Sequence, residues 1–278
     1  MTSIQRTCIF GLLALLVSIK SLAMLAPGES GNAMPDKQKY FKIEQGFSYG
    51  RILDQRMSNL HYTGPGGMLS FGRYARQDHR ITEWSFARFV YHHAVPGHEG
   101  TLVNNLALGI RYMHLWALGS RGGFDFFLGG QVNVFGDVRL APSLGNSFLF
   151  SDLVGSVHPH AYAEYSPYFF NRTWQFDFSL SMGLLGYGVR LPEYGTTFQL
   201  SGDGGSHMLS TERMILRPGN HAHFITGLFI RESFGGVHNP NFFRVGYVWD
   251  YYRIRGSHDL NVYNASHQFV LELFFMVN

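Results

Sequence analysis

WQFDFSLSMGL, residues 174–184, is the stretch of sequence that decides the fold. Every second side chain from Trp174 to Leu184 is apolar, and the side chains between them are polar or glycine. A period of two places one apolar and one polar face on a β-strand. A tilted strand needs about 9–11 residues to cross a bilayer. The stretch therefore predicts a membrane-crossing strand with one face toward lipid.

The same alternation recurs from Tyr40 onward. Its apolar positions are Phe41, Ile43, Phe47 and Tyr49; Leu106, Leu108, Ile110 and Tyr112; Phe124, Phe126, Leu128, Val132 and Val134; Ala222, Phe224, Leu228 and Ile230; and Phe243, Val245, Tyr247, Trp249 and Tyr251. The opposite faces carry charges that the core of a soluble β-sandwich or lipocalin-like barrel would not tolerate. In lipid, only a closed barrel satisfies every backbone group of a sheet. We therefore predict an all-β fold, a transmembrane antiparallel β-barrel.

The number of strands follows from counting these segments. Strands are expected near 40–50, 66–77, 81–92, 102–116, 122–137, 155–168, 172–186, 220–233, 241–254 and 266–276, with two weaker candidates at 187–200 and 208–217. Because bacterial barrels have even strand numbers, the choice is ten or twelve, and we favour twelve. Short turns such as Asn171-Arg172 are expected on the periplasmic side. Longer connections at 51–65, 93–101, 138–154 and 201–219 are expected on the outside.

Composition agrees with a wall that has one lipid-facing side and one wet side. Charged residues make up 15% of the 278 residues, whereas about 25% is usual in soluble domains, and aromatic residues reach 16%. The mean hydropathy is only -0.05, far below that of a bundle of membrane helices. No later stretch approaches 18 apolar residues in a row, the length that indicates a helical span.

The first 33 residues predict an export signal. Arg6 supplies the positive start, and Ile9 to Ser18 forms a short apolar core that ends before Lys20. Cleavage is expected after Ala23 or Ala33, where small residues precede the site. A retained helical anchor is the alternative, but the apolar run is too short to span a bilayer stably. Residues 34–278 then form a single barrel domain, without the one cysteine, Cys8.

The last predicted strand resembles the C-terminal targeting strand that the barrel-assembly machinery recognises. Its apolar face carries Phe269, Leu271, Leu273 and Phe275. A usual member ends on its aromatic residue, whereas residues 276–278 follow here.

The C-terminal half also resembles an uncharacterised family of outer-membrane barrels from Bacteroidota. The resembling segments are 191–195 (LPEYG), 223–224 (HF), 243–247 (FRVGY) and 263–270 (YNASHQFV). The resemblance implies a barrel in a Gram-negative envelope of that kind. It implies no activity.

Histidine pairs are the candidates for a metal site. His158 and His160 form one His-x-His pair, and His221 and His223 form another. Residues i and i+2 share a face of a strand, so each pair could present two imidazoles to one divalent metal, together with Glu164. The alternative is that these rings lie at the membrane interface. We expect no bound cofactor, because strands some 60 residues apart need not be neighbours.

The segment 143–160 holds the candidates for hydrolysis. Ser147, Ser151, Asp152 and His158 combine a hydroxyl, an acid and a base, as ester hydrolysis requires; Ser156 is a further serine. Loops are naturally rich in Ser and Asp, however. The motifs of outer-membrane phospholipase A and of lipid A deacylases are absent. We therefore expect no catalytic site here.

Charges on the polar faces are expected to fill the lumen. They are Lys42, Glu44, Arg111, Asp125, Asp137, Asp177, Arg231, Arg244 and Asp250. Charges of both signs can pair across a narrow barrel, and an open pore needs about 16 strands. This favours a plugged lumen over a general porin.

The expected function is that of a non-enzymatic barrel in the outer membrane of a Gram-negative bacterium. It would be a subunit or accessory of an envelope complex, or a narrow solute path. The alternative is an outer-membrane lipid hydrolase acting on phospholipid or lipopolysaccharide. Expected partners are outer-membrane lipid and lipopolysaccharide, the barrel-assembly machinery and envelope proteins. Nucleic acid is not expected, because the basic residues are scattered singly.

Overall fold

The computed structural model describes residues 38–96, 102–142, 149–194, 211–234, 241–256 and 261–277. Its strands are β1 (Gln38–Asp54), β2 (Tyr62–Gln77), β3 (Arg80–Pro96), β4 (Val103–Arg121), β5 (Phe124–Leu140), β6 (Leu149–Tyr165), β7 (Tyr168–Phe169), β8 (Arg172–Thr173), β9 (Gln175–Met182), β10 (Leu185–Tyr194), β11 (Glu212–Leu216), β12 (His221–Phe234), β13 (Asn241–Arg255) and β14 (Asn261–Met276). Within these ranges no helix has the length and apolar character to cross a membrane. The expected export signal, with its cleavage sites, lies outside the described residues.

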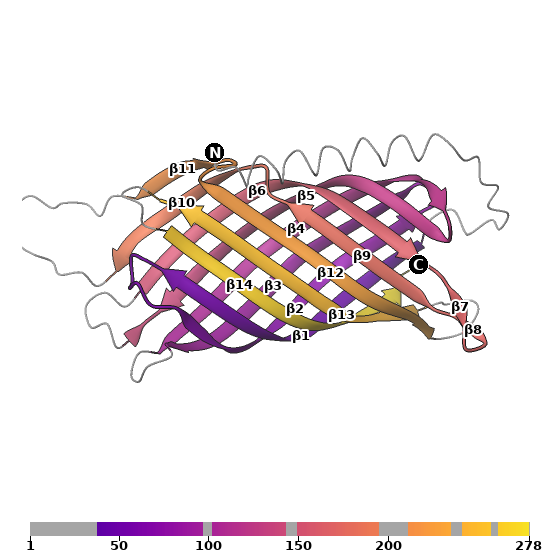
Figure 1. The fold of residues 1–278 in the computed structure, drawn as a ribbon, viewed down its shortest axis with the longest axis horizontal. Helices are drawn as coiled ribbons and strands as arrows, with labels where there is room; N and C mark the ends of the chain where they lie inside the picture. The colour runs from indigo at the N-terminus through magenta and orange to yellow at the C-terminus, as the bar shows by residue number, and fades with distance from the viewer. Residues whose placement is uncertain are drawn as a thin grey trace, which may run out of the picture.

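Ten strands close a barrel (Figure 1). Strands β1 to β6 pair in chain order, β6 pairs with β9, and β9 pairs with β12. Strands β12, β13 and β14 follow, and β14 returns to pair with β1. All these pairs are antiparallel. The strands slant across the long axis of the molecule, as closure of a sheet requires.

The prediction of twelve barrel strands is not confirmed, and the alternative of ten describes the ring. The two weaker candidates do form strands, β10 and β11, but they lie outside the ring. β10 continues along the edge of β6 that β9 leaves free, and β11 pairs with β10 alone. The difference is one of pairing partner, which the alternation of a single strand does not specify.

Both chain ends of the described barrel lie at one end, here called the proximal end; the other is the distal end. Strand β1 begins at the proximal end, where Tyr40 pairs with Met276 of β14. The connection from β4 to β5 is also proximal, and Gly122 and Gly123 both have positive φ (60° and 81°). A two-residue hairpin requires such values, and glycine adopts them without strain.

The ring strands other than β9 are long, from 14 residues in β12 to 19 in β4. A 17-residue strand such as β1 covers roughly 40 Å of barrel height at a tilt of about 40°. The apolar band of a membrane barrel is about 25 Å tall. The barrel wall therefore extends beyond such a band.

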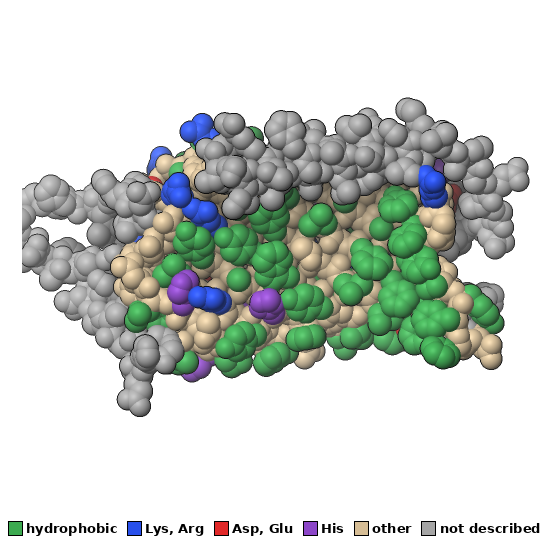
Figure 2. All heavy atoms as spheres, in the orientation of Figure 1, with side chains coloured by type: hydrophobic (Ala, Val, Ile, Leu, Met, Phe, Trp, Pro, Cys, Tyr) green, Lys and Arg blue, Asp and Glu red, His purple; other side chains and the backbone are tan. Residues whose placement is uncertain are grey.

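The two faces of each strand differ as the alternation predicts. Exposed apolar side chains point outward, including Phe47 (58% exposed), Phe178 (41%) and Phe269 (64%). Charged and polar side chains point into the lumen, where Lys42 is fully buried. Figure 2 shows patches of hydrophobic side chains along the viewed outer surface. This is a polarity inverted relative to a soluble barrel.

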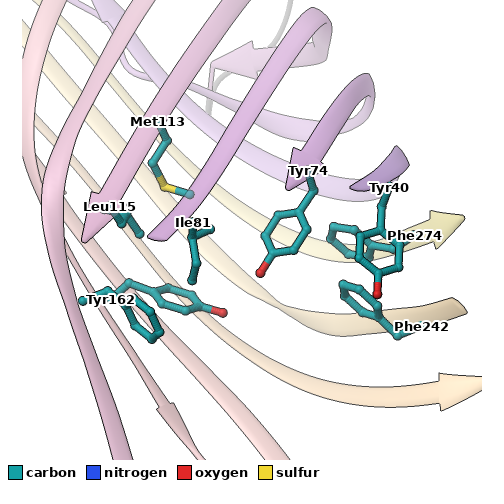
Figure 3. Packing of buried hydrophobic residues seen from close by; sticks show 9 residues of the cluster. Tyr40, Tyr74, Ile81, Met113, Leu115, Tyr162, Phe242 and Phe274 are labelled. Carbon is teal, nitrogen blue, oxygen red and sulfur yellow. The ribbon is translucent and has the colours of Figure 1, made fainter. Parts of the chain in front are cut away.

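Apolar side chains fill the proximal end of the lumen. The rings of Tyr40, Tyr74, Phe242 and Phe274 form an aromatic plug in which the Phe242 and Phe274 centroids lie 4.1 Å apart. Tyr40 packs edge-on against Phe242 at 5.0 Å. Figure 3 shows these rings converging inside the barrel from strands at opposite ends of the sequence. The plug narrows the lumen next to the chain ends.

Candidate functional site

The middle of the lumen holds a cavity lined by both polar and apolar side chains, here called the central chamber. It has a volume of about 650 Å³, its open part included. Six strands contribute polar side chains to its lining: β3 (Arg88, His92), β4 (Asn105), β5 (Asn133), β12 (His223), β13 (Asp250) and β14 (Asn264, Ser266, Gln268). On each strand these residues belong to the alternate set of side chains that points into the lumen.

Glycines on neighbouring strands make room for the histidine rings. A Cβ at Gly50 would lie 2.6 Å from the ring of His92, and one at Gly66 would lie 2.7 Å from it. A Cβ at Gly183 would lie 2.9 Å from the ring of His221. Each distance is shorter than a nonbonded contact between two such atoms. Any larger residue at these three inward positions would therefore displace the histidine ring.

A chain of polar contacts runs through the chamber. The Ser156 Oγ lies 2.9 Å from the His158 Nε2. The rings of His158 and His223 meet edge to face with centroids 4.7 Å apart. The His223 Nε2 lies 3.1 Å from the Asp250 Oδ1, and Arg88 donates to the other Asp250 oxygen at 3.4 Å. The serine and the acid therefore contact different histidines, unlike a catalytic triad in which one ring bridges both.

Several buried polar atoms around the chamber have no hydrogen-bond partner among the described residues. They are both side-chain atoms of Asn105 and the Nδ1 atoms of His92, His158 and His223. Leaving one such atom unsatisfied costs about 1–3 kcal/mol. Clusters of them are the places where water or a small polar molecule binds.

An ion-pair layer separates the chamber from the aromatic plug; we call it the proximal network. The Lys42 Nζ lies 2.8 Å from Glu83, 2.8 Å from Glu272 and 3.1 Å from Glu44. Arg244 contacts Glu272 at 2.5 Å. The remaining members are Asp177, Arg231, Glu164, Arg76 and Arg111. These contacts join side chains from opposite walls, so the network crosses the lumen.

A second ion-pair layer, the distal network, lies at the other end. Arg139 contacts Asp54 at 2.8 Å and also contacts Asp152. Arg56 reaches Asp152 at 3.0 Å, and Arg190 reaches it at 3.2 Å. These guanidinium and carboxylate groups are nearly or fully buried. The central chamber therefore lies between two paired charge layers.

The catalytic candidates do not converge on one site. Segment 149–165 is the strand β6 and not a loop, so its side chains alternate between the two surfaces. Ser151 faces outward, Asp152 belongs to the distal network and His158 faces the chamber. Ser147 lies outside the described residues. Ser156 is the serine that His158 contacts.

The metal candidates all face the lumen but do not form a metal centre. The ring centroids of His221 and His223 are 6.1 Å apart, and Glu164 is paired with Arg231 at 2.8 Å in the proximal network. His160 contacts Gln131 at 2.9 Å. Across the described ranges, no group of three or more His, Cys, Asp or Glu side chains is placed to hold a metal ion.

The expected lumenal charges lie mostly in the two networks. Glu44, Arg111, Asp177, Arg231 and Arg244 belong to the proximal network. Asp250 lines the chamber, and Asp125 lies at the proximal rim, where Ser120 donates to it. Sequence reasoning missed Asp54, Glu83, His92, Arg139 and Glu272. Each of them occupies a position that alternation with outward-facing apolar residues would assign to the lumen, and this pattern could have identified them.

These features define a class, the membrane β-barrel with an outward apolar face and a polar lumen. A scan of protein-family models finds no match, and no curated protein matches the sequence. The structure is similar to the outer membrane protease OmpT from Escherichia coli, with a TM-score of 0.51 and 8% identity over 90% of this chain and 99% of that one. The chain therefore has the fold of outer-membrane β-barrels.

Two further solved barrels resemble it less. One is Neisserial surface protein A, with a TM-score of 0.34 and 8% identity over 84% of this chain and 96% of that one. The other is the translocator domain of the autotransporter NalP from Neisseria meningitidis, with a TM-score of 0.39 and 10% identity over 94% and 95%. The resemblance to a Bacteroidota family stays a prediction.

Proposed function

We propose that the chain is a non-conducting barrel of a Gram-negative outer membrane and serves as an accessory or subunit of an envelope complex. The outward apolar face and the likeness to outer-membrane barrels support the location. Even-stranded barrels keep short turns on the periplasmic side and longer loops outside. The two-residue connections 78–79 and 122–123 are proximal, so we assign the proximal end to the periplasm.

The location has a direct test. The protein should fractionate with outer membranes and migrate faster on unheated than on heated gels, because a folded barrel resists detergent. A periplasmic product without this heat-dependent shift would contradict the proposal.

The proximal network is the observation that carries the non-conducting function. Lys42 alone joins carboxylates from β1, β3 and β14, and Arg244 connects β14 with Asp177 of β9. An ion crossing the lumen would have to separate buried pairs, and leaving one partner uncompensated costs about 3–5 kcal/mol. The aromatic plug lies behind this layer. Because the lumen is blocked, proteins of an envelope complex would contact the outer face of the barrel and its loops.

Planar-bilayer recording tests this part of the proposal. The wild-type protein should give no unitary conductance. The pair of changes Lys42→Met and Arg244→Met should loosen the layer and produce fluctuating current. Steady conductance by the wild-type protein would instead favour a solute path.

A narrow solute path is the second candidate, and the central chamber is what favours it. The chamber offers unpartnered amide and imidazole groups to a small polar solute. A vesicle-swelling assay with sugars separates the two candidates. Swelling that depends on sugar size would favour the path, and its absence favours the accessory.

Lipid hydrolysis is the rival that the geometry supports least. Ser156 and His158 are in contact, but they are 2% and 0% exposed and face the lumen. Lipid lies on the opposite surface of the wall. Purified protein in mixed micelles should therefore release no fatty acid from phospholipid or lipid A. Release that disappears with Ser156→Ala or His158→Ala would overturn the proposal.

A further inference from the structure

Cationic side chains gather on the outer face of the barrel near its distal end. We call Arg51, Arg253 and Arg255, with Tyr263 and His61, the rim patch. Arg51 and Arg255 are exposed, and Arg253 is half-buried. The Arg253 guanidinium lies over the Tyr263 ring, 5.3 Å from its centroid.

The contact of Arg51 with His61 leaves the arginine charge available. The Arg51 Nε donates to the His61 Nδ1 at 3.3 Å. Partial burial and the neighbouring Arg51 guanidinium lower the pKa of His61. The imidazole therefore accepts this bond as a neutral group, and the Nη groups of Arg51 have no hydrogen-bond partner among the described residues.

Strand register brings the arginines within reach of one ligand. Arg51 of β1 pairs with Ala265 of β14, and Arg253 of β13 pairs with Tyr263, two residues away on β14. Two strand spacings and two residues give a Cα separation of about 12 Å. Two arginine side chains can converge on neighbouring phosphate groups across that distance.

The patch lies beyond an aromatic girdle on the same strands. Toward the proximal end, the outward positions of β1 after Arg51 are Tyr49 and Phe47, and then Gln45 and Ile43. On β13 they are Tyr251, Trp249 and Tyr247, followed by Val245. Tyr and Trp mark the membrane interface, so the next residue outward lies at the height of lipid headgroups.

Carboxylates are absent from this part of the outer face in the ranges described. The acids in the distal halves of these strands, Asp54 and Asp250, point into the lumen. Exposed Arg213 and Arg217 continue the cationic rim beyond β12. In Figure 2, Lys and Arg side chains gather toward the end opposite the C-terminus, next to the hydrophobic surface.

We propose that the rim patch binds the phosphate groups of a lipid A-type glycolipid in the outer leaflet. The inference rests on the proposed location, with the distal end facing outside. The forked guanidinium donors match phosphate oxygens in pairs, and an uncharged lipid gains nothing from them. The acyl chains would lie along the apolar surface formed by Phe47, Phe269 and Val245.

Calorimetric titration of the refolded barrel in detergent tests the proposal. Diphosphorylated lipid A should bind at least about tenfold more tightly than the same lipid after removal of its phosphates. Phosphatidylglycerol, a different phosphate source, should bind more weakly than lipid A. The triple change Arg51→Gln, Arg253→Gln and Arg255→Gln should abolish the preference for the phosphorylated form.

Three exposed cations at the proximal end provide the matched control. Lys39→Gln, Arg73→Gln and Arg121→Gln remove the same charge and should leave lipid A binding unchanged. Equal binding of phosphorylated and dephosphorylated lipid by the wild-type protein would overturn the proposal, whether or not the triple variant folds. Equal binding of phosphatidylglycerol would overturn the choice of lipid A. If the protein stays heat-modifiable in outer membranes, either result leaves the proposed location intact.

Discussion

The proximal network and the central chamber lie on the same strands a few residues apart, yet their polar atoms are satisfied differently. In the network, Lys42 alone has three carboxylate partners. In the chamber, neither polar atom of Asn105 has a partner among the described residues. The first arrangement fixes the relative positions of opposite walls. The second leaves hydrogen-bonding capacity that water or a solute can use.

The difference shows that polar side chains in one lumen can have different roles: those of the proximal network hold the walls together, and those of the chamber are available to bind water or a solute. Buried ion pairs are costly to break because the remaining charge has no solvent. Unpaired amides, in contrast, lose nothing when they are replaced by apolar groups of similar shape. The two regions should therefore respond oppositely to substitution.

Removing one charge from the proximal network should have the largest effect. Arg244→Met leaves Glu272 and Asp177 without this partner and should lower the free energy of unfolding by about 3–5 kcal/mol. Urea titration in lipid vesicles, followed by tryptophan fluorescence, measures it. Arg73→Met, at an exposed outward position, should change stability by less than about 0.5 kcal/mol. Similar losses in both variants would remove the structural role of the network.

A charge placed on the lipid-facing surface should have the second largest effect, and its cost can be compared with the losses expected in the lumen. Phe178→Arg places a charge in the apolar band and should cost about 2–4 kcal/mol if the residue lies near the bilayer midplane. Ser179→Arg should cost less, because Ser179 lines a polar lumenal cavity that contains carboxylates such as Glu272 and guanidinium groups such as that of Arg244. The same vesicle titration applies. A larger penalty at Ser179 would mean that the two faces are assigned backwards.

A bonded amide at the edge of the chamber should have an intermediate effect. Asn133 accepts a hydrogen bond from Gln131 at 2.9 Å and lies 3.2 Å from the His158 Nε2. Asn133→Leu removes the acceptor of the buried Gln131 amide and should cost about 1–3 kcal/mol, while the His158 Nε2 keeps its contact with Ser156. Thermal unfolding in detergent, monitored by loss of heat-modifiable migration, ranks this variant against the others.

The unpartnered amide one strand away should have the smallest effect. Asn105→Leu removes two unsatisfied atoms while keeping a similar volume, so stability should stay the same or rise slightly. The measurement is the one used for Asn133→Leu, its matched control. A loss as large as that of Asn133→Leu would show that Asn105 has a tightly bound occupant.

The faces of the strands were predictable because they depend on local alternation. Phe178 outward and Asp177 inward follow from a period of two, with no knowledge of neighbours. The same rule identified β10 and β11 as strands. It could not place them outside the ring, because pairing partners are chosen through contacts distant in sequence.

The candidate site was less predictable for the same reason. Ser151 and Asp152 suggested a loop by composition, but Phe150, Asp152 and Val154 alternate with exposed positions and extend β6. The contact between His158 and His223 joins β6 and β12, the two strands that pair with β9 in the ring. Such a contact requires that β6 and β12 both flank β9, and the alternation within each strand does not specify those pairings.

Closure of the ring has a consequence for the order of folding. Strand β1 pairs with β14, and the register runs from Tyr40 with Met276 to Asp54 with Val262. These partners are more than 200 residues apart, so the seam cannot form until β14 has been synthesised. Loop-closure entropy makes such distant pairings slow, and the edges of β1 and β14 stay unpaired meanwhile. Until β14 pairs with β1, the unpaired backbone N–H and C=O groups of both strands must therefore be kept from pairing with other chains.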